Sequence, residues 1–119
     1  MQKVNLAEKL TRFTERWSPR IVGELNGQQV KIAKLEGEFV WHHHADADEL
    51  FLVLAGQLVI HLRDQAIALG PGELLIVPKG VEHRPVADGE VHVLLFEPAG
   101  TLNTGNVIDD RTVADPERL

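Results

Sequence analysis

Hydrophobic and polar positions alternate along most of the chain with the period of β-strands. Between residues 20 and 97, short runs rich in Val, Ile and Leu are separated by Gly, Pro and Asp. Successive side chains of a strand point to opposite faces, so a period of two predicts half-buried strands. We expect strands at residues 21–25, 28–35, 39–44, 50–55, 57–63, 65–69, 74–77 and 91–97. Seven or eight short strands joined by tight turns predict an all-β sandwich or small barrel.

Turn residues separate the predicted strands at short intervals. Asn26-Gly27 is a typical hairpin sequence, and Gly70-Pro71-Gly72 and Pro78-Lys79-Gly80 are typical of tight turns. No helical stretch of about ten residues separates any two strands, whereas parallel strands need such crossovers. The pattern therefore disfavours a parallel βαβ architecture.

The first 19 residues have a helical period instead. Asn5 can cap a short helix, with Glu8 three residues later as in a capping box, and Pro19 ends it. Spacings of four, three and four place four apolar residues on one face: Leu6, Leu10, Phe13 and Trp17. We expect this face to pack on the sheet or on a second subunit.

The length of 119 residues fits one domain, 1–119, because domains typically contain about 100–150 residues. Within it we expect a helical segment (1–19), a β-barrel (20–97) and a polar C-terminal tail (98–119) that runs along the outside.

Charge and cysteine content exclude several classes of function. With 12 basic and 18 acidic residues the formal net charge is −6, which argues against nucleic acid or an anionic membrane as a partner. The absence of cysteine excludes disulfides, iron–sulfur clusters and thiol chemistry. No apolar run reaches the roughly 18 residues of a membrane helix, and no signal peptide is apparent. We therefore expect a cytoplasmic protein.

Three of the six histidines are consecutive. On a strand, His42 and His44 face one side while His43 faces the other. Two imidazoles arranged in this way can bind one metal ion, although a hydrated surface cluster explains such a run equally well. Glu49 lies at the start of the most hydrophobic strand, where it is either the last residue of a solvated loop or a buried carboxylate, which would need a cation or a proton. His83 follows a Pro-x-Gly turn, so these candidates all lie at strand ends.

Three imidazoles and one carboxylate suit a borderline divalent metal such as Fe, Mn, Ni, Co or Zn. Four protein ligands on an octahedral ion leave two positions open for water, dioxygen or a small-molecule ligand. First-row ions compete for the same ligands, so the sequence does not identify the metal.

Two motifs carry a resemblance to a known family. They are Gly37-x4-His42-x-His44-x4-Glu49-x6-Gly56 and Gly72-x5-Pro78-x-Gly80-x2-His83. In this order they resemble the two motifs of the cupin superfamily. Trp41-His42-His43-His44 followed by Asp48-Glu49-Leu50-Phe51 resembles in particular the small single-domain cupins labelled mannose-6-phosphate-isomerase-like. That label does not establish sugar isomerase activity.

The resemblance implies both a fold and a set of ligands. The fold is a double-stranded β-helix, or jelly-roll barrel, here with a short N-terminal helix. The implied ligands of one divalent transition metal are His42, His44, Glu49 and His83. Small cupins commonly form dimers, so we also expect a homodimer.

The cupin fold supports many reactions, so function is less defined than fold. We expect a metalloenzyme that acts on a small polar molecule, isomerase-like or dioxygenase-like; the alternatives are a non-catalytic binding or sensing module and a vestigial, empty site. No acid/base pair stands out beyond the ligands, so no catalytic residue is assigned. His61 and His92 can each be interpreted as pocket or surface residues, and His43 as a surface residue.

Overall fold

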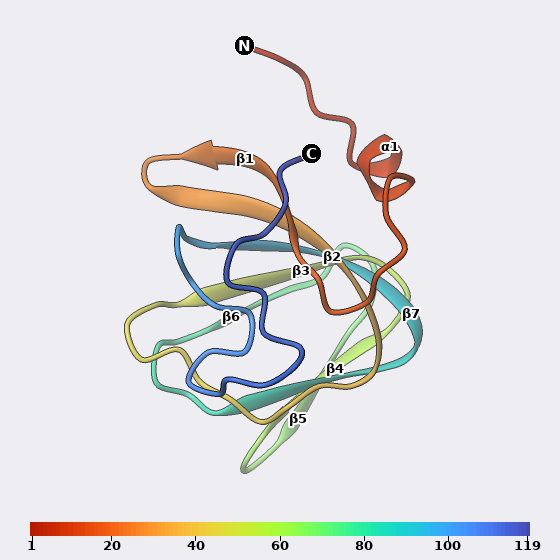
Figure 1. Ribbon diagram of the computed structural model, residues 1–119. Coiled ribbons are helices and arrows are strands. Elements are labelled where there is room, and N and C mark those ends of the chain that lie inside the picture. Colours follow the sequence, from red (N-terminus) through yellow and green to blue (C-terminus); the bar gives the residue numbers. More distant parts are fainter.

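The structure is a computed structural model that describes residues 1–119, and its regular structure is almost entirely antiparallel β-sheet (Figure 1). One short helix, α1 (Leu6–Leu10), precedes seven strands. They are β1 (Arg20–Leu25), β2 (Gln28–Glu38), β3 (Glu49–Ala55), β4 (Leu58–Leu62), β5 (Ala66–Leu69), β6 (Leu74–Val77) and β7 (His83–Pro98). The all-β class is therefore confirmed.

Strand β7 belongs to both halves of the sheet. It has 16 residues, and its C-terminal part pairs with β2 on one side and β3 on the other. Its N-terminal part pairs with β4, which pairs with β5, while β6 extends the sheet beyond β3. Because one long strand serves both halves, the sheet curls over itself and encloses the core (Figure 1). A jelly-roll barrel requires this curled antiparallel arrangement.

The inward face of the sheet is apolar over most of its length. Along β7 the buried side chains of Val91, Val93 and Leu95 alternate with half-buried side chains that face outward. The same alternation makes Glu97 the next inward residue of β7 and Glu49 the first inward residue of β3. The strand period therefore brings two carboxyl groups into the barrel, beside a twelve-residue apolar core.

The hairpin predicted at Asn26-Gly27 joins β1 to β2. Both residues have positive φ, 52° and 77°, as a type I′ turn requires. The register that follows pairs Leu25 with Gln28 directly across the turn.

The N-terminal helix is confirmed but is shorter than expected. Asn5 Oδ1 accepts the Glu8 amide at 3.1 Å, yet α1 has five residues and ends at Leu10. The prediction that Phe13 and Trp17 continue its apolar face is wrong, because the chain beyond α1 pairs with β2: the Trp17 amide donates to Lys34 O at 2.8 Å. No helix of the structure has the length and apolar character needed to span a membrane.

The apolar residues of this segment nevertheless pack on the chain's own sheet. Leu10 and Phe13 form a second small core with Val22 and Ile32. Trp17 packs instead against the main core. The helix face is therefore covered within one chain.

The strand predicted at residues 39–44 is not a strand in the structure. Phe39 N–H donates to Pro85 O at 3.0 Å, but Pro85 has no N–H with which to continue the ladder. In place of the expected strand, this segment forms an isolated β-bridge between His42 and His83. Conversely, β7 begins at His83, whereas the sequence predicted a strand only from residue 91, because Pro85 and Gly89 disfavour strand.

The C-terminal segment, residues 98–119, is tied to the barrel. Leu119 N–H donates to Ile21 O at 3.0 Å, and Ile21 N–H donates to Glu117 O at 2.9 Å, so the last residues line the edge of β1. Thr104, in the middle of this segment, is fully buried. The ribbon follows this segment across the barrel towards β1 (Figure 1).

Candidate metal centre

The four residues predicted as a metal site lie together inside the barrel. Each is at most 7% exposed, and one potential ligand atom from each lies within 4.8 Å of the others. The residues are His42, His44, Glu49 and His83. The structure thus brings together the set predicted from the sequence, while their role as ligands stays a prediction.

Strand ends and one turn hold these residues in place. His42 and His83 exchange two backbone hydrogen bonds, at 3.0 and 2.9 Å. The amide of Gly80, in the turn before His83, donates to His44 O at 2.8 Å. The Pro-x-Gly turn of the second motif therefore positions the histidines of the first motif as well as its own.

Backbone carbonyls orient two of the imidazole rings. Nδ1 of His42 lies 2.9 Å from Val40 O, and Nδ1 of His83 lies 3.0 Å from Val81 O. A carbonyl only accepts, so each Nδ1 carries the hydrogen and each Nε2 keeps its lone pair. Metal-binding histidines are typically oriented by such a bond through the second ring nitrogen.

The centre of the cluster contains buried polar atoms without hydrogen-bond partners. Nε2 of His44 and Nε2 of His83 each lie 3.3 Å from Glu49 Oε1, and none of these three atoms is hydrogen-bonded. Buried polar atoms are rarely left unpaired in proteins. A cation bound between them would satisfy all three, so the donor set fits a metal ion.

The protonation states also suit a metal. Burial and the neighbouring His83 lower the pKa of His42 to about 4, so this imidazole is neutral at pH 7. Burial alone would raise the pKa of Glu49, but in the metal-free state in which the His44 and His83 rings carry a proton at Nε2, these rings and the Glu97 carboxyl group hold that pKa well below its usual range. Neutral imidazoles and an ionised carboxylate are the forms that bind metals.

A buried, hydrogen-bonded pair of polar side chains adjoins the cluster. Lys31 Nζ lies 2.8 Å from Glu97 Oε1, and the two side chains are 2% and 1% exposed. Glu97 follows Phe96, which pairs with Leu50, so Glu97 lies beside Glu49 inside the barrel. Burial and the Glu49 charge raise the pKa of Glu97 well above its usual range. The neighbouring carboxyl groups therefore favour opposite protonation states.

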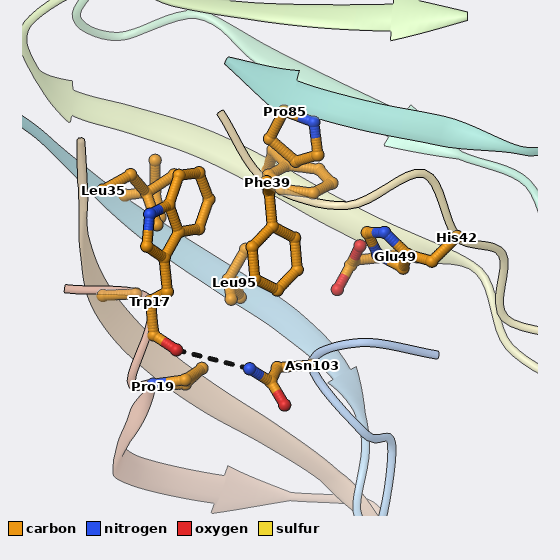
Figure 2. Close-up of a pocket in the computed structure, with 12 residues that line it drawn as sticks. Trp17, Pro19, Leu35, Phe39, His42, Glu49, Pro85, Leu95 and Asn103 are labelled. Atoms are coloured by element: carbon orange, nitrogen blue, oxygen red, sulfur yellow. Dashed lines mark hydrogen bonds between the residues drawn. The ribbon is translucent and has the colours of Figure 1, made fainter. Parts of the chain in front are cut away.

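A small cavity of about 30 Å³ opens beside the cluster (Figure 2). Its wall includes two residues of the cluster, His42 and Glu49, together with Asn103. The remainder is apolar and includes Trp17, Leu35, Phe39, Phe51, Pro85 and Leu95. The rings of Trp17 and Phe39 stack with centroids 4.5 Å apart.

Segments from both ends of the chain close this cavity. The Asn103 amide donates to Trp17 O at 3.3 Å and to Arg111 O at 2.9 Å, and its oxygen accepts from Val113 N at 2.8 Å. Trp17 has a φ of 58°, which is uncommon for a bulky residue. Figure 2 shows Asn103 and Trp17 joined across the cavity from Glu49 and His42.

The other histidines point away from the cluster. His43 lines a surface depression of about 350 Å³, in keeping with the predicted surface role, and His44 of the cluster lines the same depression. His61 is half-buried on the outer face of β4, whose inward residues include Ile60. His92 lies on the outer face of β7 and contacts Glu90. Of the two interpretations left open for His61 and His92, the structure supports the surface.

Several residues of this region were not identified from the sequence. Lys31 and Glu97 did leave a signal, since each interrupts the inward apolar positions of a strand with a charge. Trp17 and Asn103 left none, because they reach the cavity from segments without strand periodicity.

Gly105 also lacked a sequence signal, but it packs tightly on the histidine run. A Cβ at this position would lie 2.2 Å from His43 O. The C-terminal segment therefore supports the backbone that carries His42 and His44.

Comparison with known proteins identifies the family. The family model described as a cupin domain matches residues 28–97, which include all four residues of the cluster. The chain belongs to the cupins. The jelly-roll fold inferred from the motifs is thereby confirmed.

Related cupins of known sequence or structure include proteins without an assigned activity. The chain is 40% identical over 81 residues to the uncharacterized protein YdbB of Bacillus subtilis, covering 67% of this chain and 72% of that protein. A cupin-2 domain protein from Shewanella frigidimarina is 49% identical, with a TM-score of 0.79 over 80% of this chain and 93% of that one. Protein NMB1881 from Neisseria meningitidis is 29% identical, with a TM-score of 0.76 over 82% and 100% of the two chains.

We predict that Gly105→Ala weakens metal binding by about tenfold or more, because the new Cβ must displace His43 and with it the neighbouring ligands. Gly100→Ala is the matched control, since Gly100 also has a positive φ but a Cβ there meets no atom within 4 Å. Isothermal titration with Zn²⁺ measures both variants. Equal losses in the two would assign the effect to backbone strain alone.

We predict that Lys31→Met lowers the free energy of unfolding by about 1–3 kcal/mol, because it leaves the buried Glu97 carboxyl group without its hydrogen-bond partner. The double substitution Lys31→Met with Glu97→Leu should recover most of this loss, since it removes both polar groups. Urea unfolding of the metal-free protein measures both. A double variant as unstable as the single one contradicts the explanation.

Proposed function

We propose that the cluster holds one divalent transition metal and that the protein is a small metalloenzyme of isomerase or dioxygenase type. The observation that carries this proposal is the set of converging, unpartnered atoms at His44, Glu49 and His83, all of them buried. An apolar barrel gains nothing from three unsatisfied polar atoms unless a cation pairs with them.

The position of the cavity supports a reaction with a small molecule. His42 and Glu49 belong to both the cluster and the cavity wall, so a molecule in the cavity would lie beside the metal. A bound divalent ion would supply Lewis-acid chemistry at an oxygen of that molecule. The protein's own contribution is to exclude water with Trp17 and Phe39 and to orient the molecule against the cluster.

A non-catalytic metal-binding or sensing module is the second candidate. It is favoured by one observation: beyond the cluster, the polar side chain that lines the cavity is Asn103, which cannot act as an acid or base. The two candidates differ in turnover. Oxygen uptake by the Fe(II) protein, or proton exchange of carbonyl compounds in D₂O with the Mn(II) or Zn(II) protein, supports the enzyme. Absence of both across a broad panel supports the module.

We predict about one transition metal ion per chain after purification without chelator or a histidine tag. His44→Ala and His83→Ala should each lower the affinity for the metal more than about 100-fold, because each removes a ligand rather than a supporting group. Elemental analysis and titration with a chelating dye measure occupancy and affinity.

His43→Ala is the matched control, since it alters the same histidine run but lies outside the cluster. It should retain full occupancy. Loss of metal from all three variants alike would indicate a surface histidine site and contradict the proposal.

We also propose that the chain forms a homodimer through strand β6. This strand is at the edge of the sheet, and its outward residues Leu74 and Ile76 are 53% and 54% exposed. They continue the outward apolar face of β3, where Leu50 and Leu52 pair with them. An open apolar edge favours pairing with a second copy about a two-fold axis.

We predict that Ile76→Lys gives a monomer, because it places a charge at this edge. Light scattering at micromolar concentration should give twice the 13.2 kDa chain mass for the native protein and the single chain mass for the variant. Ile108→Lys is the control, because Ile108 is 73% exposed on the C-terminal segment. A native protein that is monomeric under these conditions refutes the dimer.

A further inference from the structure

The cavity beside the cluster offers a ligand almost no polar partner. None of the twelve residues that line it is a lysine or an arginine. Apart from the cluster residues His42 and Glu49, its one polar side chain is Asn103. Most of the wall consists of aromatic and aliphatic groups, with the stacked Trp17 and Phe39 on one side.

Both N–H groups of Asn103 are already used by the protein. Its amide donates to two carbonyls, Trp17 O and Arg111 O, and its oxygen accepts from Val113 N. These bonds hold the N-terminal and C-terminal segments together at the cavity (Figure 2). A ligand that took the N–H groups would have to break these bonds, so Asn103 offers a ligand at most the second lone pair of its Oδ1.

We propose that the cavity selects a small molecule with an apolar body and a single donor atom, which binds the metal. The proposal rests on the proposed metal site and narrows the class of ligand from a small polar molecule to one with one polar end. The polar end would lie at His42 and Glu49, and the apolar body would lie against Trp17, Phe39 and Leu95.

The composition of the wall disfavours sugars and sugar phosphates. Beyond the cluster and one lone pair of Asn103, the wall has no partner for an additional hydroxyl group, so each one that leaves water weakens binding by about tenfold or more. A phosphate group would also find no cationic side chain in the wall.

The volume restricts the size of the ligand. A cavity of about 30 Å³ has space for two or three water molecules, whereas a benzene-sized ligand needs on the order of 150 Å³. The ligand therefore has few heavy atoms, or it must separate the Trp17 and Phe39 rings.

A pair of three-carbon thiols tests the proposal. 1-Propanethiol and 1-thioglycerol have the same skeleton and the same donor atom, and the second adds two hydroxyl groups. A thiol that binds a metal loses its proton, and thiolate bound to Co(II) adds a near-ultraviolet absorption that reports binding. We expect the Co(II) protein to bind 1-propanethiol at least about tenfold more tightly than 1-thioglycerol. Equal or tighter binding of 1-thioglycerol, or no response to either thiol, overturns the proposal.

Two isosteric variants distinguish thiol binding in the cavity from general effects of the thiols on the protein. Val93 and Val53 are both fully buried and pair with each other across β7 and β3, but only Val93 lines the cavity. Val93→Thr adds a hydroxyl group to the wall and should reduce the preference for 1-propanethiol by about threefold or more. Val53→Thr should leave the preference unchanged. Equal changes in the two variants overturn the proposal.

The experiment distinguishes failure of the proposed metal site from failure of the proposed ligand selectivity of the cavity. If the protein does not bind Co(II), the proposed function fails, and the cavity is tested in the metal-free Trp41→Phe variant, whose one tryptophan is Trp17. The fluorescence of Trp17 should then respond to 1-propanethiol at lower concentration than to 1-thioglycerol, because Trp17 lines the cavity. An equal response, or no response to either thiol, overturns the cavity proposal.

Discussion

The burial of four polar side chains inside an apolar barrel is the constraint on which this structure depends. Inward atoms of three of them, His44, Glu49 and His83, have no hydrogen-bond partner, and the four side chains converge on one point where a cation could satisfy these atoms. The backbone around them is arranged accordingly. His42 and His83 are joined by a bridge, the turn at Gly80 holds His44, and the C-terminal segment packs on the histidine run at Gly105. Parts of the chain far apart in sequence are thus committed to holding one small cluster.

Burial also determines which carboxyl groups inside the barrel are charged. Two carboxyl groups, from Glu49 and Glu97, lie side by side where water is excluded, and the cost of two adjacent buried negative charges is high. Their pKa values move in opposite directions, down at Glu49 and up at Glu97. With Glu97 protonated, the negative charge of this carboxyl pair lies on Glu49, and Lys31 contacts the far side of Glu97. A divalent ion would be attracted to that side of the barrel.

The sequence predicted those features that depend on local period and on spacing. Alternation identified most strands, and the spacing of His42, His44, Glu49 and His83 identified the cluster. It did not predict the end of β2 or the start of β7. Pro85 has no backbone N–H, so the pairing between β7 and the segment after β2 is interrupted at this residue. Nor did it predict how residues 11–19 run, since the pairing of Trp17 with Lys34 is a tertiary contact that overrides helical spacing. The cavity wall was beyond sequence reasoning for the same reason: it combines residues from five segments of the chain.

The four residues of the cluster and the residues that close the cavity lie in different parts of the chain with respect to the family model. The part of the chain that the family model matches, residues 28–97, contains the four residues of the cluster and also Phe39. Trp17 and Asn103 lie on either side of that part, and they close the cavity by bonding to each other. A cluster supplied by the barrel can support one kind of metal chemistry in many chains, whereas segments outside the barrel decide which molecule reaches it. The cluster therefore lies within the part of the chain that defines the family, whereas the two ends of the chain close the cavity beside it.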